Sequence, residues 1–278
     1  MPAERIAENL AFINWTVLTA LALGSFGAVV AGRLRTSATR GYLGFTALCA
    51  VAFGLLAVAS DGALPVVSPG SPILADPAWD AARRAALWLF CGLAAAYAVA
   101  IFGGRGARPV AYAGVLTGAA VLLLAGLSWG GGPLGVALLV VQLALLAGAT
   151  GGVWAAMILG HWYLVTPHLG EAPLVQFARA IGLIVAVQVA LFALWTASGA
   201  GPAGAPGFAA LGGAWALFVW LRLIVGLVFP LIVSWAALQT ARTRSMESAT
   251  GLLYIELGTI AAGTILAAGL YFGAGLLV

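Results

Sequence analysis

Residues 134–163 read LGVALLVVQLALLAGATGGVWAAMILGHWY, a run without a single Asp, Glu, Lys or Arg. A helix that crosses the roughly 30 Å hydrocarbon core of a bilayer needs about 20 consecutive apolar residues. The run is longer than that, so we expect its last residues, HWY, to reach the membrane interface, where Trp and Tyr are enriched. Pro167 is expected to end this helix, because proline lacks the backbone N–H that a helix interior requires.

Seven further apolar runs have the length of a membrane span. They cover residues 10–32, 41–60, 84–103, 109–128, 173–198, 209–240 and 250–277. The whole chain is 63% hydrophobic and 7% charged, whereas about 25% of the residues of a soluble domain are charged. We therefore predict an all-α integral membrane protein with eight transmembrane helices, in which residues 1–278 form a single polytopic domain with the lipid bilayer as its solvent.

Composition also excludes several classes of function. No polar, charge-balanced segment is long enough to form a separate soluble domain. The net charge of +4 is modest, and no basic stripe or base-stacking module indicates a nucleic-acid partner. The metal-binding motif HExxH does not occur in the sequence, so we predict no metal site.

The arginines predict the orientation in the membrane. Those in or beside the odd-numbered connections are Arg33, Arg35, Arg40, Arg105, Arg108, Arg179, Arg242 and Arg244. The even-numbered connections carry Arg83 and Arg84 beside Asp61, Asp76 and Asp80. Because cytoplasmic loops carry an excess of basic residues, we expect the odd-numbered connections in the cytoplasm and both termini on the outer side. A bacterial inner membrane fits this pattern.

Two pairs of segments suggest an internal duplication. ALGSFGAVVAGRL (22–34) is similar to GATGGVWAAMILGHW (148–162), and RPVAYAGVLTGAAVLLLAG is similar to SATGLLYIELGTIAAGTILAAG. The halves would be residues 1–130 and 131–278, four helices each, in parallel orientation. An eight-helix plan of this kind is similar in architecture to the quinone-binding membrane anchors of molybdopterin-type oxidoreductases.

Glycines within the apolar runs have a packing role. Lipid provides little hydrophobic drive for helix association, so small residues are enriched where helices approach closely. We expect such approaches at Gly24, Gly27, Gly148, Gly151, Gly152, Gly258 and Gly263.

Three polar residues inside the apolar runs stand near one depth. Arg222 is about 16 Å from the outer end of its run, at about 1.5 Å per residue, and Gln188 and Gln142 lie within roughly 4 Å of that depth. They either hydrogen-bond between helices or form a polar pocket that binds a quinone or another substrate. Pro230 is expected to kink the same helix as Arg222 and to free a carbonyl near position 226.

Glu256 is the acidic residue well inside an apolar run, and the sequence does not decide which residue it contacts. Arg222 lies roughly 10 Å away in depth; Arg179 and His161 are the other candidates, and a buried carboxyl can also stay protonated. Glu256 is therefore a candidate proton relay or a structural partner. We single out Glu256 and His161 as candidate catalytic residues.

Both histidines of the chain lie in GHWYLVTPH, residues 160–168. One interpretation is an aromatic belt with two interfacial histidines. The alternative is a cytoplasmic functional patch that consists of His161, His168, Glu171, Gln176 and Arg179. His161 could also donate to a quinone, and one haem held by a single histidine is not excluded.

Three classes of function remain open. The first is a membrane subunit of a respiratory or other electron-transfer complex, which anchors partner redox subunits and binds quinone or supports proton transfer. The second is a small-molecule or ion transporter with a midplane site at Arg222. The third is a membrane-embedded, lipid-modifying enzyme with acid–base chemistry at the interfacial histidines.

Overall fold

A computed structural model describes residues 1–67, 70–166, 168–204 and 206–278. These residues form helices, turns and coil, with no strand among them, and eight helical segments are long and apolar enough to cross a membrane. The segments are α2 (Leu10–Arg35), α3 (Arg40–Gly62), α4 (Asp80–Phe102), α5 (Arg108–Trp129), α6 (Pro133–Val165), α7 (Ala172–Ser198), the continuous series α8 (Ala216–Leu223), η3 (Ile224–Val228) and α9 (Phe229–Arg242), and α10 (Met246–Ala274). The prediction of an all-α membrane protein with eight spans is confirmed.

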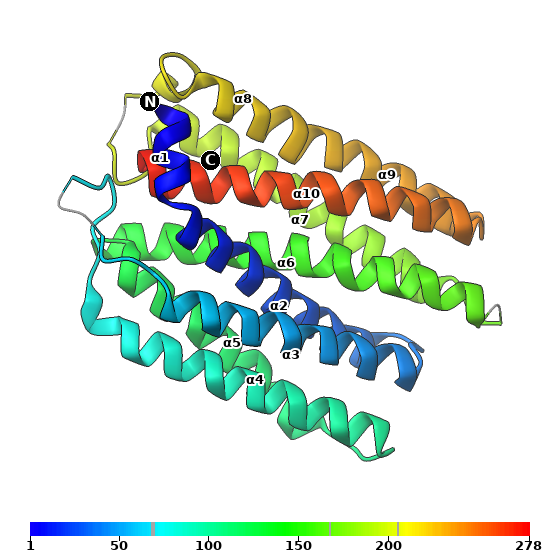
Figure 1. Ribbon diagram of the computed structural model, residues 1–278. Helices are drawn as coiled ribbons and strands as arrows, with labels where there is room; N and C mark the ends of the chain where they lie inside the picture. Colours follow the sequence, from blue (N-terminus) through cyan, green and yellow to red (C-terminus); the bar gives the residue numbers. More distant parts are fainter. Residues whose placement is uncertain (68–69, 167, 205) are drawn as a thin grey trace.

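The long helices run roughly side by side in three groups (Figure 1). α2 and α6 lie in the middle, α3, α4 and α5 on one side of them, and α7, α8, α9 and α10 on the other. A short helix, α1 (Pro2–Glu8), lies across the end of α10. The first and last residues are at the same end of the bundle.

The two ends of the bundle differ in charge. We call the end where α2, α4, α6 and α9 finish the basic end. Eight of the twelve arginines lie at this end or within about two turns of it: Arg33, Arg35, Arg40, Arg105, Arg108, Arg179, Arg242 and Arg244. We call the opposite end, with both chain termini, the terminal end.

α2 and α6 approach each other closely at two glycines. A Cβ atom added to Gly24 would lie 1.8 Å from the backbone oxygen of Ala147, and one on Gly151 would lie 2.2 Å from the nitrogen of Ser25. Gly263 and Gly226 make a similar contact between α10 and η3. The predicted packing role is wrong for Gly27 and Gly258, where an added Cβ would meet no atom within 4 Å, because these two glycines face away from the neighbouring helix.

Helix boundaries depart from the prediction where capping groups act. α4 begins at Asp80, four residues before the apolar run, after a 3₁₀ turn η1 (Pro77–Trp79). The Asp76 side chain accepts from the backbone N–H of Ala78 at 3.0 Å and starts that turn. The seventh span begins at Ala216 rather than at 209, because residues 209–211 form a separate 3₁₀ turn, η2 (Ala209–Leu211), and Gly213 follows with φ 75°.

The seventh span contains a π-helical turn, Ile224–Val228, directly before Pro230. Proline has no N–H to donate to the carbonyl four residues earlier, which here belongs to Gly226. A π-bulge is one way in which a helix absorbs such a defect. The Gly226 carbonyl accepts a hydrogen bond from Arg222 Nη1 at 3.2 Å, as the position of Pro230 predicts. Pro167, predicted to end α6, lies outside the described residues; α6 itself ends at Val165.

Candidate functional site

A groove of 760 Å³ lies between α5 and the pair α6 and α7, with α2 as its floor. We call it the lateral groove. Its lining is mostly small and apolar, and includes Gly27, Ala28 and Ala31 of α2, Gly114, Val115 and Gly118 of α5, Ala144 and Gly148 of α6, and Leu183 and Ile184 of α7. Its volume is within the range of pockets that hold small molecules.

α5 and α6 are in close contact near the terminal end of the lateral groove. Towards the terminal end, a Cβ on Gly126 of α5 would lie 2.5 Å from Val140 Cγ2, and one on Gly130 would lie 2.6 Å from the backbone of Val136. Nearer the basic end, α2 lies between the two helices. Small residues on this part of α2, such as Gly27, leave the space between α5 and α7 unfilled.

Polar side chains gather where the lateral groove reaches the basic end. Arg35 at the end of α2, and Gln176 and Arg179 in the first turns of α7, line it there, and all three are exposed. Neither arginine has an acidic group within 4 Å among the described residues. Phe177, next to Gln176, is buried and contributes a ring to the wall. The groove thus has an apolar body and a mouth that donates hydrogen bonds.

The structure divides the predicted cytoplasmic patch. Gln176 and Arg179 line the lateral groove, whereas Glu171 faces Arg244, with 3.8 Å between the carboxylate and the guanidinium. His168 is exposed in the turn before α7. His161 is exposed and lies against α10, where its ring is 3.0 Å from the Tyr254 hydroxyl.

Two of the three polar residues predicted to lie near one depth, Arg222 and Gln188, are joined. The predicted depth of Arg222 is wrong, because its span begins at Ala216, which places Arg222 about 9 Å rather than 16 Å from the start of the span. Arg222 is 2% exposed, and its Nη2 donates to Gln188 Oε1 at 2.7 Å. Its Nε donates to the backbone oxygen of Val278 at 3.5 Å, and Gln188 Nε2 donates to the Leu145 carbonyl at 3.3 Å. Gln142 is also buried, but its side-chain oxygen has no partner among the described residues. These are contacts between helices, and Arg222 does not line the lateral groove.

Glu256 is fully buried between α10 and α9. One carboxylate oxygen accepts from the Ser234 hydroxyl, and the other has no partner among the described residues. The partners expected for Glu256 were Arg222, Arg179 and His161; the structure gives it Ser234 instead, because α9 brings this serine to the same level of the bundle. Within the described chain, no three His, Cys, Asp or Glu side chains gather in a metal-binding group.

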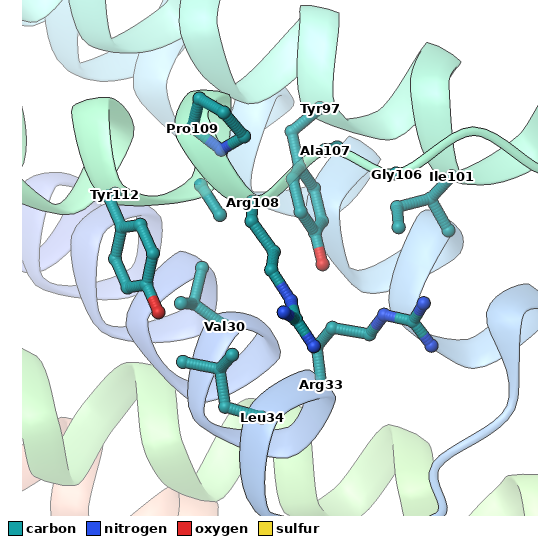
Figure 2. A pocket seen from close by; sticks show the side chains of 11 residues that line it. Val30, Arg33, Leu34, Tyr97, Ile101, Gly106, Ala107, Arg108, Pro109 and Tyr112 are labelled. Atoms are coloured by element: carbon teal, nitrogen blue, oxygen red, sulfur yellow. The ribbon is translucent and has the colours of Figure 1, made fainter.

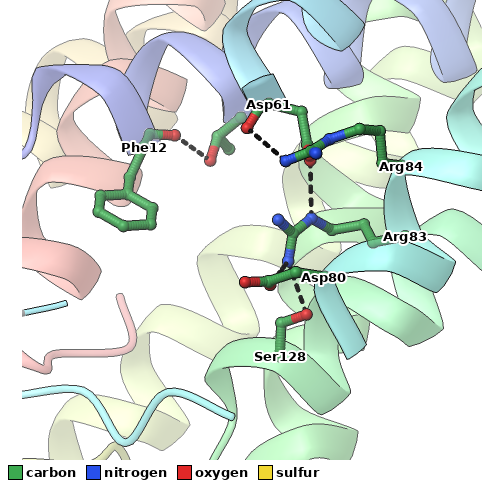
Figure 3. Close-up of polar contacts among 7 residues, drawn as sticks. Phe12, Asp61, Asp80, Arg83, Arg84 and Ser128 are labelled. Carbon is green, nitrogen blue, oxygen red and sulfur yellow. Dashed lines mark hydrogen bonds and ion pairs between the residues drawn. The ribbon is translucent and has the colours of Figure 1, made fainter. Parts of the chain in front are cut away.

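A buried charge network at the terminal end was not foreseen (Figure 3). Asp61, at the end of α3, accepts from Arg83 Nε at 2.8 Å and from Arg84 Nε at 3.0 Å. The Arg83 side chain is 2% exposed, also donates to Asp80 and Ser128, and lies 4.4 Å from the centre of the Trp129 ring. The sequence analysis assigns these charges to a loop. Asp61 lies in the last turn of α3, and Asp80, Arg83 and Arg84 lie in the first turns of α4. Opposite charges at the facing ends of two consecutive spans are the signal that could have predicted the pairing.

Comparison of the chain with protein-family models, with curated proteins and with solved structures finds no match.

Proposed function

We propose that the protein is a membrane subunit of an electron-transfer complex and that the lateral groove binds an isoprenoid quinone. The observation that carries the proposal is the mouth of the groove, where Arg35, Gln176 and Arg179 offer hydrogen-bond donors beside an apolar cavity. A quinone has two carbonyl oxygens that accept hydrogen bonds and a long tail that prefers an apolar surface. The two ends of the groove supply both kinds of contact.

The lining of the lateral groove supports a quinone headgroup at the basic end of the groove. Phe177 lies beside Gln176 and Arg179, so a planar ring held by these donors would contact an aromatic face, and aromatic rings attract one another beyond their area burial. The small residues of α2, among them Gly27 and Ala28, leave room for the tail along the membrane-spanning part of the groove. Electrons would come from partner subunits, which the extramembrane loops would anchor.

Neither candidate catalytic residue has a step in this proposal. Glu256 and His161 make their contacts with α9 and α10, and the lateral groove is lined by α2, α5, α6 and α7 with Phe90 of α4. A role of Glu256 in proton transfer therefore remains a prediction, for which Glu256→Gln in the assembled complex is the test.

Filling the lateral groove tests the proposal. In Gly27→Leu the new side chain projects into the cavity, because a Cβ at Gly27 meets no atom within 4 Å. We expect this variant, purified in mild detergent, to retain about tenfold less quinone than the wild type, a loss of roughly 1.4 kcal/mol in binding free energy. Quinone would be extracted and quantified by mass spectrometry.

A matched control separates occlusion from general damage. Gly92 of α4 is exposed on the bundle surface, and a Cβ there also meets no atom within 4 Å, so Gly92→Leu adds the same side chain away from the groove. Gly92→Leu should retain quinone at the wild-type level. Equal quinone content in both variants, or no quinone in the wild type purified from quinone-producing membranes, would refute the quinone site.

The paired arginines favour a second candidate, a carrier or enzyme for an isoprenoid or lipid with an anionic head. Arg35 and Arg179 lack acidic partners among the described residues, so a phosphate at the mouth would be held by two guanidinium groups. The same extraction distinguishes the two candidates. An anionic lipid retained by the wild type and by Gly92→Leu, but lost from Gly27→Leu, would support the second candidate in place of the quinone.

A further inference from the structure

A second, smaller cavity lies at the basic end, on the α4 side of α2. It encloses 440 Å³ and is formed by the last turns of α2 and α4 and the first turn of α5. We call it the basic pocket. Arg33 of α2, Tyr97 of α4 and Arg108 of α5 supply its polar groups, and Val30, Ile101 and Ala111 belong to its apolar wall.

The polar groups of the basic pocket converge (Figure 2). The hydroxyl of Tyr97 points toward the guanidinium groups of Arg33 and Arg108. Tyr97 is 1% exposed, and its hydroxyl has no hydrogen-bond partner among the described residues. A buried hydroxyl without a partner costs free energy, so this atom is a vacant donor aimed at the space between two positive charges.

Charge in the basic pocket is uncompensated. No carboxylate lies within 4 Å of Arg33 or Arg108 in the described part of the chain. α5 also begins here, at Arg108, and no side chain caps its N-terminus. The N-terminus of a helix carries a partial positive charge and free N–H groups. Three features of the pocket therefore favour an anion: the Tyr97 hydroxyl, the two arginines and the N-terminus of α5.

We propose that the basic pocket binds the phosphate group of an anionic phospholipid. Two guanidinium groups and one hydroxyl are the donors that a phosphate with three or four acceptor oxygens uses. The rim favours a lipid as the source of this phosphate, because Leu34 is 45% exposed and Tyr112 is 51% exposed beside the pocket. Acyl chains can pack on these two side chains while the headgroup occupies the cavity.

The basic pocket is separate from the lateral groove, so it can be tested independently of the quinone proposal. The experiment uses the full-length protein in detergent, with phosphatidylglycerol as the lipid probe, phosphatidylcholine as the zwitterionic reference and inorganic phosphate as the soluble probe. Bound lipid is measured by native mass spectrometry and bound phosphate by calorimetry. Arg33→Ala with Arg108→Ala should weaken phosphatidylglycerol binding by more than about tenfold, because hydrogen bonds to charged groups are lost at two places.

Two single variants define the geometry. Tyr97→Phe keeps the ring and removes only the hydroxyl, so we expect an approximately fivefold loss with no change in charge. Arg105→Ala removes the same charge as one of the pocket arginines from the adjoining turn, outside the basic pocket. It should leave phosphatidylglycerol binding within about twofold of the wild type, because Arg105 does not line the basic pocket.

Each result decides between outcomes. A loss confined to the pocket variants, with phosphatidylglycerol preferred over phosphatidylcholine, supports the lipid headgroup. Phosphate binding that the pocket variants abolish, without any effect on lipid binding, keeps the anion site but assigns it to a soluble phosphate and overturns the lipid. Equal losses in Arg105→Ala and in the pocket variants, or no loss in any, overturn the site. Gly27→Leu should bind phosphatidylglycerol normally, so failure of the quinone proposal is a distinct result.

Discussion

Charged side chains inside this bundle are neutralised in two different ways. Arg83 pairs with a carboxylate, whereas Arg222 is held by an amide oxygen and backbone carbonyls. Both arrangements offset part of the cost of burying a charge in an apolar medium, which is several kcal/mol. The first produces a local ion network at one end, and the second links α8 to α7 and, through Gln188, to α6.

The hydrogen bond between Arg222 and Gln188 should show as an energetic coupling. Arg222→Ala leaves Gln188 Oε1 without its 2.7 Å donor, and Gln188→Ala removes the best acceptor of Arg222. Each variant is expected to lose about 1.5–3 kcal/mol of stability, and the double variant less than the sum by about 0.5–3 kcal/mol. Thermal unfolding in detergent measures all three, with the exposed Arg242→Ala as control. Additive effects would show that the pair does not act as a unit.

The ion network should depend on which arginine is removed. Asp61→Asn or Arg83→Gln leaves the opposite charge buried, and we expect about 3–5 kcal/mol of destabilisation. Arg84 binds the same carboxylate but is 47% exposed, so Arg84→Gln should cost at most about 1 kcal/mol. The unfolding temperatures of the three variants provide the comparison. Equal losses for Arg83→Gln and Arg84→Gln would contradict the assignment of Arg83 as the buried partner.

Between helices, close backbone contacts occur where glycine leaves room for them. At the crossing of α2 and α6, Gly24 and Gly151 occupy positions where any side chain would overlap with backbone atoms. At Gly27, one turn further along α2, the same type of residue borders open space. The first pair holds the two central helices together, and the third glycine helps to form the lateral groove.

The same substitution, glycine to alanine, should therefore change the stability in opposite directions at two positions. Gly151→Ala places a methyl group 2.2 Å from the Ser25 nitrogen and is expected to destabilise the protein by about 1–3 kcal/mol. Gly258→Ala meets no atom within 4 Å and gains helix propensity, so it should be neutral or stabilising by up to about 1 kcal/mol. Thermal unfolding of the two proteins tests the difference. A stable Gly151→Ala would mean that α2 and α6 can separate without cost.

For the molecule as a whole, the distribution of arginines predicts the orientation in the membrane, which the helix bundle by itself does not define. If the basic end faces the cytoplasm, residue 245 is inside and residue 75 is outside. A membrane-impermeant maleimide should label Ala75→Cys in intact spheroplasts and Ser245→Cys only after lysis. Both positions are exposed, whereas the native Cys49 and Cys91 lie within spans, so the unmodified protein serves as the background. The reverse labelling pattern would invert the topology.

The sequence predicts what depends on hydropathy. Eight spans follow from the apolar runs. A hydrogen bond between Arg222 and Gln188 was one of two alternatives for the buried polar residues, and the structure contains it. Rotation about a helix axis is not encoded in a single span, so the separation of Glu171 from Gln176 and the exposure of Gly27 to a cavity could not be derived. The pairing of Asp61 with Arg83 was not predicted, because the sequence of the loop between α3 and α4 does not define the distance between the two helix ends.

The lateral groove is bounded towards the terminal end by the contact of α5 with α6 near Gly126, and its polar residues lie at the basic end. If the groove binds a guest dissolved in the membrane, as proposed, the guest would enter sideways from one leaflet and leave by the same route, without crossing from one aqueous side to the other. Its occupancy would then follow its mole fraction in the membrane rather than its amount per volume of buffer. Diluting proteoliposomes at a fixed ratio of guest to lipid should leave the bound fraction unchanged, whereas adding empty lipid should lower it.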